Sequence, residues 1–219
     1  MIEIIDTGDG SQSLRIPELE ETYHSRKGAA QESQYVFIDK GLAQINKKKV
    51  AVLEIGFGTG LNALLAWAYA RKSGQTLYYT SIEKYPLKSE IYKEFSRDWL
   101  EQQSLYKEYL MLHESAWMHD VELGPEFILR KVEADWVDYK IVGTYDIVFY
   151  DAFAPSKQEE MWASKLIQRC YDSLESGGIL VSYCAQGQFR RNLQDSGFIV
   201  ERLEGPPGKR EMIRAIKPS

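Results

Sequence analysis

The segment from residue 50 to residue 74, VAVLEIGFGTGLNALLAWAYARKSG, constrains the fold more than any other part of the chain. Its first six residues are almost continuously apolar, which is typical of a strand buried in a parallel sheet. Three glycines follow at alternate positions, and strong helix formers then continue to a Lys-Ser-Gly ending. A buried strand joined to a helix by a glycine turn is the repeating unit of an α/β sheet, and we expect that unit here.

Strand and helix patterns alternate along the rest of the chain. We predict strands at 77–86, 126–135, 145–153 and 178–185, and helices at 88–118 (one or two), 159–174 and 188–194. Two further runs, 198–205 and 209–217, flank a Pro-Pro-Gly turn and predict a C-terminal antiparallel hairpin. The expected fold is therefore an α/β fold with a mostly parallel sheet covered on both faces and a hairpin at its end.

The N-terminal part has a different pattern. Residues 2–16 place two apolar runs around a Thr-Gly-Asp-Gly turn, which predicts a short hairpin, and residues 18–41 mix small, polar and aromatic types before a helix. We expect residues 1–40 to form a hairpin and capping segment, and residues 41–219 to form the main domain.

Composition excludes several classes of protein. The 219 residues suffice for one domain with a small extension, and the net charge of −5 describes neither a disordered nor a strongly basic protein. No apolar run approaches the roughly 18 residues that cross a bilayer, so we expect a cytoplasmic protein without membrane contact.

Metal chemistry has little support in the sequence. Cys170 and Cys184 belong to no CxxC pair, and we expect both to be buried free thiols. His113 and His119 are six residues apart, unlike the i, i+4 pair of a zinc-binding helix, so no metal site is expected.

Ligands of open α/β sheets bind at the carboxyl ends of the strands, and four predicted ends carry suitable residues. The turn after Glu54 has the spacing G-x-G-x-G (Gly56, Gly58, Gly60), which matches neither the dinucleotide fingerprint nor a phosphate loop. Glu83, at the second end, suits the two hydroxyls of a ribose. Asp135, at the third, suits the amine of an adenine, although each acid alone could be a solvated strand end.

The ordered set of glycines, two acids and a terminal hairpin predicts a Rossmann-like S-adenosylmethionine-dependent methyltransferase. Asp151 ends the fourth strand, in the sequence DAFAP, and is the expected reaction centre. Its carboxylate could receive or relay the proton of an amine; alternatively a backbone carbonyl near Phe153 orients the amine and the carboxylate has only a positioning role. The alternative is that Asp151 caps the following helix.

Five segments together carry a more specific resemblance: YHSRKGAAQES, LEIGFGTGLN, SIEKYPL, DAFAPSKQEEMW and GKREM, in this order. They resemble the family of tRNA 5-methylaminomethyl-2-thiouridine methyltransferases, which is also the methyltransferase half of the bifunctional MnmC enzymes. The similarity extends from about Tyr23 to Lys217. One departure is Gln158-Glu159, where family members have Asn-Pro.

The resemblance implies methylation of the 5-aminomethyl group on the wobble uridine, in the anticodon of tRNA, with S-adenosylmethionine as cofactor. It also implies roles for the matching residues. The cofactor would contact Tyr23, Ser25, Glu32, Glu54, Gly56, Gly58, Gly60, Asn62, Glu83, Lys84 and Asp135. Asp151 and Phe153 would be catalytic, and His24 and Lys157 would contact substrate. Because the chain has no room for the fused oxidase half, a separate flavin-dependent oxidase would act upstream.

An acidic protein needs a local basic surface to bind tRNA. The residues from Gln186 to the end carry seven basic and four acidic side chains, and Lys209 and Arg210 occupy the turn of the hairpin. We expect these two to guide the phosphate backbone while the target base is extruded. Otherwise the charge is an ordinary solvated surface.

Three other functions share these features. An aminopropyltransferase has a similar glycine turn and ribose acid, but its loop usually offers more than one acid, whereas DAFAPS has one. A small-amine methyltransferase of the same fold is a further alternative. A non-catalytic RNA-binding module would have no need for the complete set of glycines and acids.

Overall fold

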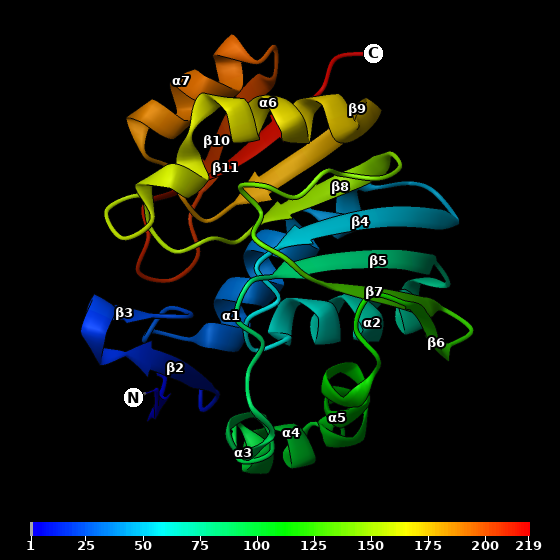
Figure 1. The fold of residues 1–219 in the computed structure, drawn as a ribbon, viewed down its shortest axis with the longest axis vertical. Helices are drawn as coiled ribbons and strands as arrows, with labels where there is room; N and C mark the ends of the chain where they lie inside the picture. Colours follow the sequence, from blue (N-terminus) through cyan, green and yellow to red (C-terminus); the bar gives the residue numbers. More distant parts are fainter. Residues whose placement is uncertain (1) are drawn as a thin grey trace.

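Eight strands form one sheet in the computed structural model, which describes residues 2–219 (Figure 1). Five neighbouring strands are parallel, whereas β10, β11 and β6 run antiparallel to their neighbours. In spatial order the strands are β10 (Ile199–Glu204), β11 (Glu211–Ile216), β9 (Leu174–Ser182), β8 (Tyr145–Tyr150), β4 (Lys49–Ile55), β5 (Thr76–Glu83), β7 (Phe127–Glu133) and β6 (Asp120–Gly124).

Helices cover both faces of this sheet. The α-helices are α1 (Ala29–Ser33), α2 (Leu61–Ser73), α3 (Ser89–Tyr92), α4 (Arg97–Gln102), α5 (Tyr106–Glu114), α6 (Ser164–Ser173) and α7 (Gly187–Asp195). Short 3-10 turns lie at η1 (Pro17–Leu19), η3 (Leu42–Gln44) and η4 (Glu159–Trp162), and η2 (Gln34–Asp39) is a π-helix. Alternate residues of β4 point to opposite faces, so Val52 joins the core under η2 and α2 while Leu53 joins the core under α6 and α7.

The predicted α/β fold, parallel sheet and terminal hairpin are confirmed, and three details of the prediction are wrong. The region 88–118 holds three short helices, because Ser96 and Ser104 adopt left-handed φ values of 49° and 56° that interrupt a helix. Strand β6 was not predicted, because its alternation of polar and apolar residues covers only four positions and the strand is paired on one side only. The helix expected at 159–174 is divided at Ala163, whose ψ of 143° is extended.

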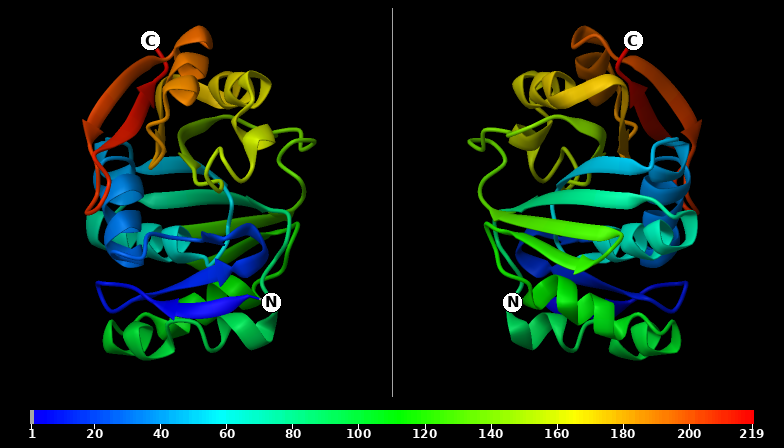
Figure 2. Two further views of the ribbon diagram at one scale, coloured as in Figure 1. Left: turned by 90° about the vertical axis from the view of Figure 1, so that its left-hand side faces the viewer. Right: turned by 90° about the vertical axis from the view of Figure 1, so that its right-hand side faces the viewer.

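The N-terminal hairpin is also confirmed. Strands β1 (Glu3–Asp6) and β2 (Gln12–Ile16) pair antiparallel, and β3 (Glu21–Thr22) adds a third strand. Two hydrogen bonds attach this small sheet to the helical region after β5. Ser96 Oγ accepts the Gln12 N–H at 3.0 Å, and Gln12 Oε1 accepts the Ser96 N–H at 2.7 Å. The small sheet lies on the side toward which the parallel strands point (Figures 1 and 2).

Three predictions concern the cysteines, membrane-spanning helices and metal sites. Cys170 and Cys184 are buried free thiols, as expected. Within residues 2–219 no helix combines the length and the apolar character that crossing a bilayer requires. The same residues contain no group of three or more His, Cys, Asp or Glu side chains placed to hold a metal ion.

Candidate active site

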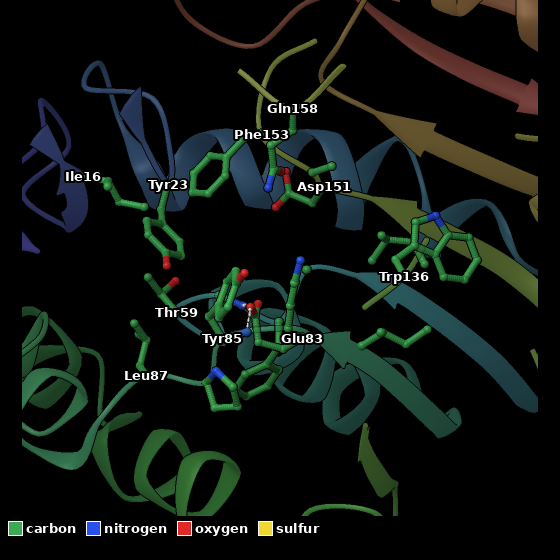
Figure 3. Close-up of a pocket in the computed structure, with 18 of the residues that line it drawn as sticks. Ile16, Tyr23, Thr59, Glu83, Tyr85, Leu87, Trp136, Asp151, Phe153 and Gln158 are labelled. Atoms are coloured by element: carbon green, nitrogen blue, oxygen red, sulfur yellow. Dashed lines mark hydrogen bonds between the residues drawn. The ribbon is translucent and has the colours of Figure 1, made fainter. Parts of the chain in front are cut away.

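A cavity of about 590 Å³ opens at the carboxyl ends of β4, β5, β7 and β8 (Figure 3). Residues that follow all four strands line it, and Tyr23 and His24 from the N-terminal segment complete its wall. The parallel strands place it there, because their carboxyl ends meet at one edge of the sheet. A cavity of this volume is typical of cofactor and small-molecule sites.

The glycine turn brings backbone directly to the cavity wall. Gly56 and Gly58 have φ values of +94° and +50°, in the region that favours glycine. A Cβ on Gly56 would lie 3.0 Å from the carbonyl oxygen of Asp151, and a Cβ on Gly58 would lie 3.0 Å from the Tyr23 ring. No side chain fits at either position, and helix α2 begins directly after the turn.

Glu83 ends β5 and holds two neighbouring loops with its carboxylate. Its Oε2 accepts the backbone N–H of Gly58 at 2.9 Å, and its Oε1 accepts the backbone N–H of Tyr85 at 2.8 Å. Each carboxylate oxygen can accept a second hydrogen bond. Glu83 therefore fixes the turn and can still receive donors from a ligand in the cavity.

Asp135 stands two residues beyond β7 and reaches the cavity as part of an ion pair. Lys84 Nζ lies 2.7 Å from its Oδ2, and its Oδ1 accepts the backbone N–H of Val137 at 2.9 Å. The bond from Lys84, followed by the one from Val137, lowers the pKa of Asp135. Asp135 is therefore an ionised acceptor at neutral pH.

Asp151 follows β8 and projects into the cavity beside α2 (Figure 3). Asn62 Nδ2 donates to its Oδ2 at 2.8 Å. Burial raises the pKa of Asp151 to about 7, against the lowering effect of the Asn62 bond. The helix-cap alternative is wrong, because the residues after Asp151 form a loop and the first helical turn there is η4, which starts at Glu159.

An aromatic pair lies next to Asp151. The rings of Tyr23 and Phe153 meet edge to face with centroids 5.0 Å apart. Trp162 Nε1 donates to the carbonyl oxygen of Phe153 at 2.9 Å, and the Trp162 ring is buried against Tyr150. Trp162 thus anchors the DAFAP loop from inside the core and leaves Phe153 at the cavity.

Of the predicted site residues, ten line the cavity and seven do not: Ser25, Glu32, Glu54, Gly60, Lys157, Lys209 and Arg210. Glu54 lies fully buried behind the turn, where Ser81 Oγ donates to it at 2.5 Å and burial raises its pKa to about 8. Lys157 and Arg210 are exposed, whereas Lys209 turns inward to Glu32.

Some lining residues were missed in the sequence. Tyr183 directly follows β9, lines the cavity and donates through its hydroxyl to the carbonyl oxygen of Ala152 at 2.8 Å. The strand-end rule that selected Glu83 and Asp151 would have found Tyr183 as well. Thr59 and Gln158 also line the cavity, but they lie within loops, and no local pattern marks them.

The buried side chain of Lys131 contacts His113, which in turn contacts the glycine turn. Lys131 has no exposed surface and donates to the carbonyl oxygen of His113 at 2.7 Å, with its Nζ 4.6 Å from the Trp117 ring centroid. His113 Nε2 in turn lies 3.0 Å from the carbonyl oxygen of Thr59, within the turn. Burial lowers the pKa of Lys131 to about 8.

This lowered pKa predicts how stability depends on pH. Lys131 titrates near 10.4 in the unfolded chain, so between about pH 8 and 10.4 the unfolded state binds more protons than the folded state. The free energy of unfolding should therefore rise across this window by about 1–3 kcal/mol relative to Lys131→Met. Denaturant unfolding of both proteins at several pH values measures this difference. If the difference in the free energy of unfolding between the two proteins stays constant with pH, the pKa of Lys131 is not lowered in the folded state.

Comparison with known proteins places the chain in a family. The sequence model of a family described as S-adenosyl-L-methionine-dependent methyltransferase matches residues 89–218, which is more than half of the chain. The chain belongs to this family. The methyltransferase therefore uses S-adenosylmethionine.

The methyltransferase has relatives among curated proteins and solved structures. The tRNA 5-methylaminomethyl-2-thiouridine biosynthesis bifunctional protein MnmC of Campylobacter hominis is 31% identical over 199 residues, covering 88% of this chain and 29% of that protein. Its counterpart in Marinobacter nauticus is 30% identical over 218 residues, covering 91% and 34%. The chain thus spans about a third of the length of the curated relatives it matches.

One solved structure is similar over the whole chain. MNMC2 from Aquifex aeolicus superposes with a TM-score of 0.83 at 27% identity, covering 100% of this chain and 72% of that chain. The sugar N-methyltransferase KedS8 from Streptoalloteichus reaches a TM-score of 0.53 at 11% identity, covering 87% and 88%, and shares the fold.

The residues of the cavity fit S-adenosylmethionine. Gly56 and Gly58 leave room for close approach to the backbone. Four cavity residues have buried polar atoms without a hydrogen-bond partner among residues 2–219: His24 Nδ1, Thr59 Oγ1, Asn62 Oδ1 and Trp136 Nε1. Buried polar groups are normally paired, so the cavity suits a ligand that carries both donors and acceptors.

Proposed function

We propose that the protein methylates the 5-aminomethyl group of the wobble uridine, or 2-thiouridine, of tRNA to 5-methylaminomethyl. The observation that carries this proposal is Asp151, a carboxylate with a pKa of about 7 in the cavity, beside the aromatic pair of Tyr23 and Phe153. The names of the relatives that match most of the chain support a tRNA substrate.

The cofactor would occupy the part of the cavity between the glycine turn and the end of β7. Gly56 and Gly58 would contact its methionine part, Glu83 its ribose hydroxyls and Asp135 its adenine amine. Residues 1–40 would act as a cap on the domain formed by residues 41–219, with Tyr23 closing over the ligand. S-adenosylmethionine supplies an electrophilic methyl group, and the protein supplies position and a proton acceptor.

Asp151 would accept the proton that the substrate amine must lose, since an ammonium nitrogen has no lone pair. A carboxyl with a pKa of about 7 is half ionised at neutral pH, which suits transient proton acceptance. Asn62 fixes one oxygen of Asp151 and leaves the other for the amine. The carbonyl oxygen of Phe153 already accepts from Trp162, so the carboxylate is better placed than this carbonyl to orient the amine.

The tRNA backbone would cross the surface that carries the DAFAP loop and the C-terminal hairpin. Lys157 of the loop and Arg210 of the hairpin are exposed and can contact phosphates. We propose a cytoplasmic location, which a tRNA substrate would support. We also propose that a flavin-dependent oxidase acts upstream of this methylation; the names of the relatives call them bifunctional, which indicates a second activity in those proteins.

The direct test is transfer of a labelled methyl group from S-adenosylmethionine to tRNA from cells that lack this modification step. We expect label in the wobble nucleoside with the wild type, and at least about a hundredfold less with Asp151→Ala. Label in small amines alone would favour a small-amine methyltransferase. Transfer from decarboxylated S-adenosylmethionine would indicate an aminopropyltransferase, and tRNA binding without any transfer would indicate an RNA-binding module.

A further inference from the structure

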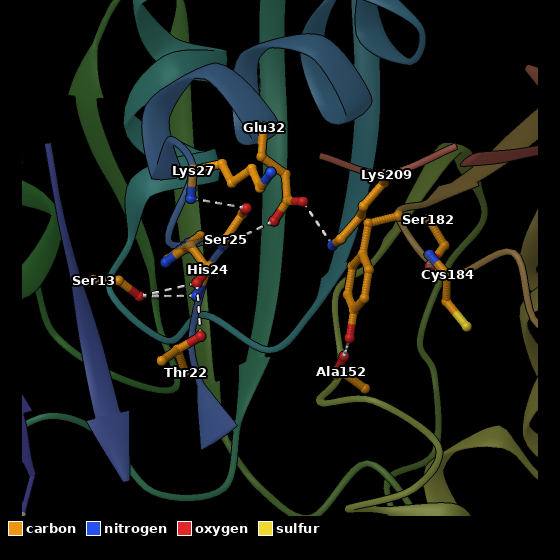
Figure 4. A network of polar contacts seen from close by, with 11 residues as sticks. Ser13, Thr22, His24, Ser25, Lys27, Glu32, Ala152, Ser182, Cys184 and Lys209 are labelled. Carbon is orange, nitrogen blue, oxygen red and sulfur yellow. Dashed lines mark hydrogen bonds and ion pairs between the residues drawn. The ribbon is translucent and has the colours of Figure 1, made fainter. Parts of the chain in front are cut away.

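A lysine from the C-terminal hairpin fills a small polar subsite at the edge of the cavity. Lys209 lies in the turn between β10 and β11, which the bond from Lys209 N–H to the carbonyl oxygen of Pro206 closes at 2.9 Å. Its Nζ lies 2.6 Å from Glu32 Oε2, and Figure 4 shows the two side chains pointing at each other. Glu32 is nearly buried, with 8% of its side chain exposed.

The other wall of this subsite is aromatic. Lys209 Nζ lies 3.8 Å from the centroid of the Tyr183 ring. The hydroxyl of Tyr183 is bonded to the carbonyl oxygen of Ala152, the neighbour of Asp151, so the ring is held against the reaction centre. Glu32 is held as well, because its Oε1 accepts the N–H of Ser25 at 3.2 Å.

A carboxylate facing an aromatic ring is the chemistry that binds an alkylammonium ion. The head group of a lysine and a protonated aminomethyl substituent are both primary alkylammonium groups. The charges of Glu32 and Lys209 both act on the pKa of Asp151, which agrees with a subsite close to that carboxylate.

We propose that Glu32 and Tyr183 form the subsite for the ammonium group of the substrate, and that Lys209 occupies it until substrate displaces it. This inference rests on the proposed function, because it assigns the residues that recognise the substrate amine. Glu32 and Tyr183 bind the protonated amine beside Asp151, which then receives its proton. Lys209 competes with substrate and keeps Glu32 paired in the free protein.

The test compares two tRNAs that differ only in the aminomethyl group of the wobble uridine. Their dissociation constants are measured at pH 7 with S-adenosylhomocysteine bound, and the ratio isolates the contribution of the amine. A contact between a basic side chain and phosphate affects both tRNAs equally and leaves the ratio unchanged. We expect Lys209→Met to raise the preference for the aminomethyl tRNA about tenfold, and Glu32→Gln to abolish it.

Further variants separate recognition from folding. Glu32→Gln/Lys209→Met removes both charges, leaves no unpaired buried carboxylate and should also lack the preference. Tyr183→Phe keeps the ring and should keep the preference, whereas Tyr183→Leu should reduce it. Arg210→Met, at the neighbouring exposed position, should weaken both tRNAs alike. S-adenosylhomocysteine binding by each variant verifies that it folds.

The outcomes distinguish the two proposals. If the wild type prefers the aminomethyl tRNA and Lys209→Met lowers or keeps that preference, Lys209 is not a competitor and the inference is wrong. If Glu32→Gln or the double variant keeps the preference, Glu32 does not bind the amine. A wild type that binds both tRNAs equally overturns the proposed substrate, and the subsite with it.

Discussion

Asp151→Asn should lower kcat for methyl transfer by about 10²- to 10⁴-fold while leaving the affinity for S-adenosylmethionine within about twofold of the wild type. The amide keeps the size of the side chain but cannot accept a proton from the substrate amine. An asparagine at this position can still accept the hydrogen bond from Asn62 Nδ2 through its amide oxygen, so the start of α2 and the turn before it should be unchanged.

The pH profile provides the more specific readout. Because the acceptor must be ionised and burial raises the pKa of Asp151 to about 7, wild-type turnover should rise with pH up to about 7 and then level off. Asp151→Asn should lose this inflection. Rates are measured in single-turnover experiments with saturating cofactor between pH 5.5 and 9.

Asp138→Asn is the matched control, since Asp138 is an exposed acid outside the cavity lining. It should keep both the rate and the pH profile of the wild type. If Asp151→Asn were as active as this control at every pH, the proton-acceptor role would be excluded and Asp151 would only position the amine.

Glu83→Gln should raise the dissociation constant of S-adenosylmethionine about tenfold to a hundredfold. The carboxylate oxygens accept the N–H groups of Gly58 and Tyr85. The glutamine amide has one oxygen and one NH2 group, so one of these two N–H groups would face another donor and lose its hydrogen bond. The substitution therefore loosens the turn that approaches the cofactor, and it also removes charge from the acceptor assigned to the ribose hydroxyls.

Glu133→Gln, on the neighbouring strand, is the matched control. Glu133 ends β7 directly opposite Glu83 in the parallel register, but its side chain is exposed. Titration calorimetry should find Glu133→Gln close to the wild type. An unchanged affinity in Glu83→Gln, with thermal unfolding also unchanged, would remove Glu83 from the cofactor site.

The local sequence patterns were sufficient to predict the strand ends and the glycine turn that form the site. The apolar run before Gly56 specifies a buried strand, and the glycines specify a turn that side chains would block. Since the carboxyl ends of parallel strands gather at one edge, the positions of Glu83, Asp135 and Asp151 along the chain also predicted that they share a cavity. The edge strand β6 alternates polar and apolar residues over only four positions, and no local pattern marks the interruptions at Ser96 and Ser104.

The sequence by itself therefore determined the strand-turn-helix unit, the sheet with its terminal hairpin and the acids at the strand ends, because each depends on residues that are neighbours in the chain. Only the tertiary structure decided that Glu54 lies behind the turn, that Lys131 is buried against the carbonyl oxygen of His113, and that Lys209 meets Glu32. Burial and ion pairing depend on which distant segments pack together. The hairpin turn and the N-terminal segment are far apart in the chain, so no local pattern predicts their contact.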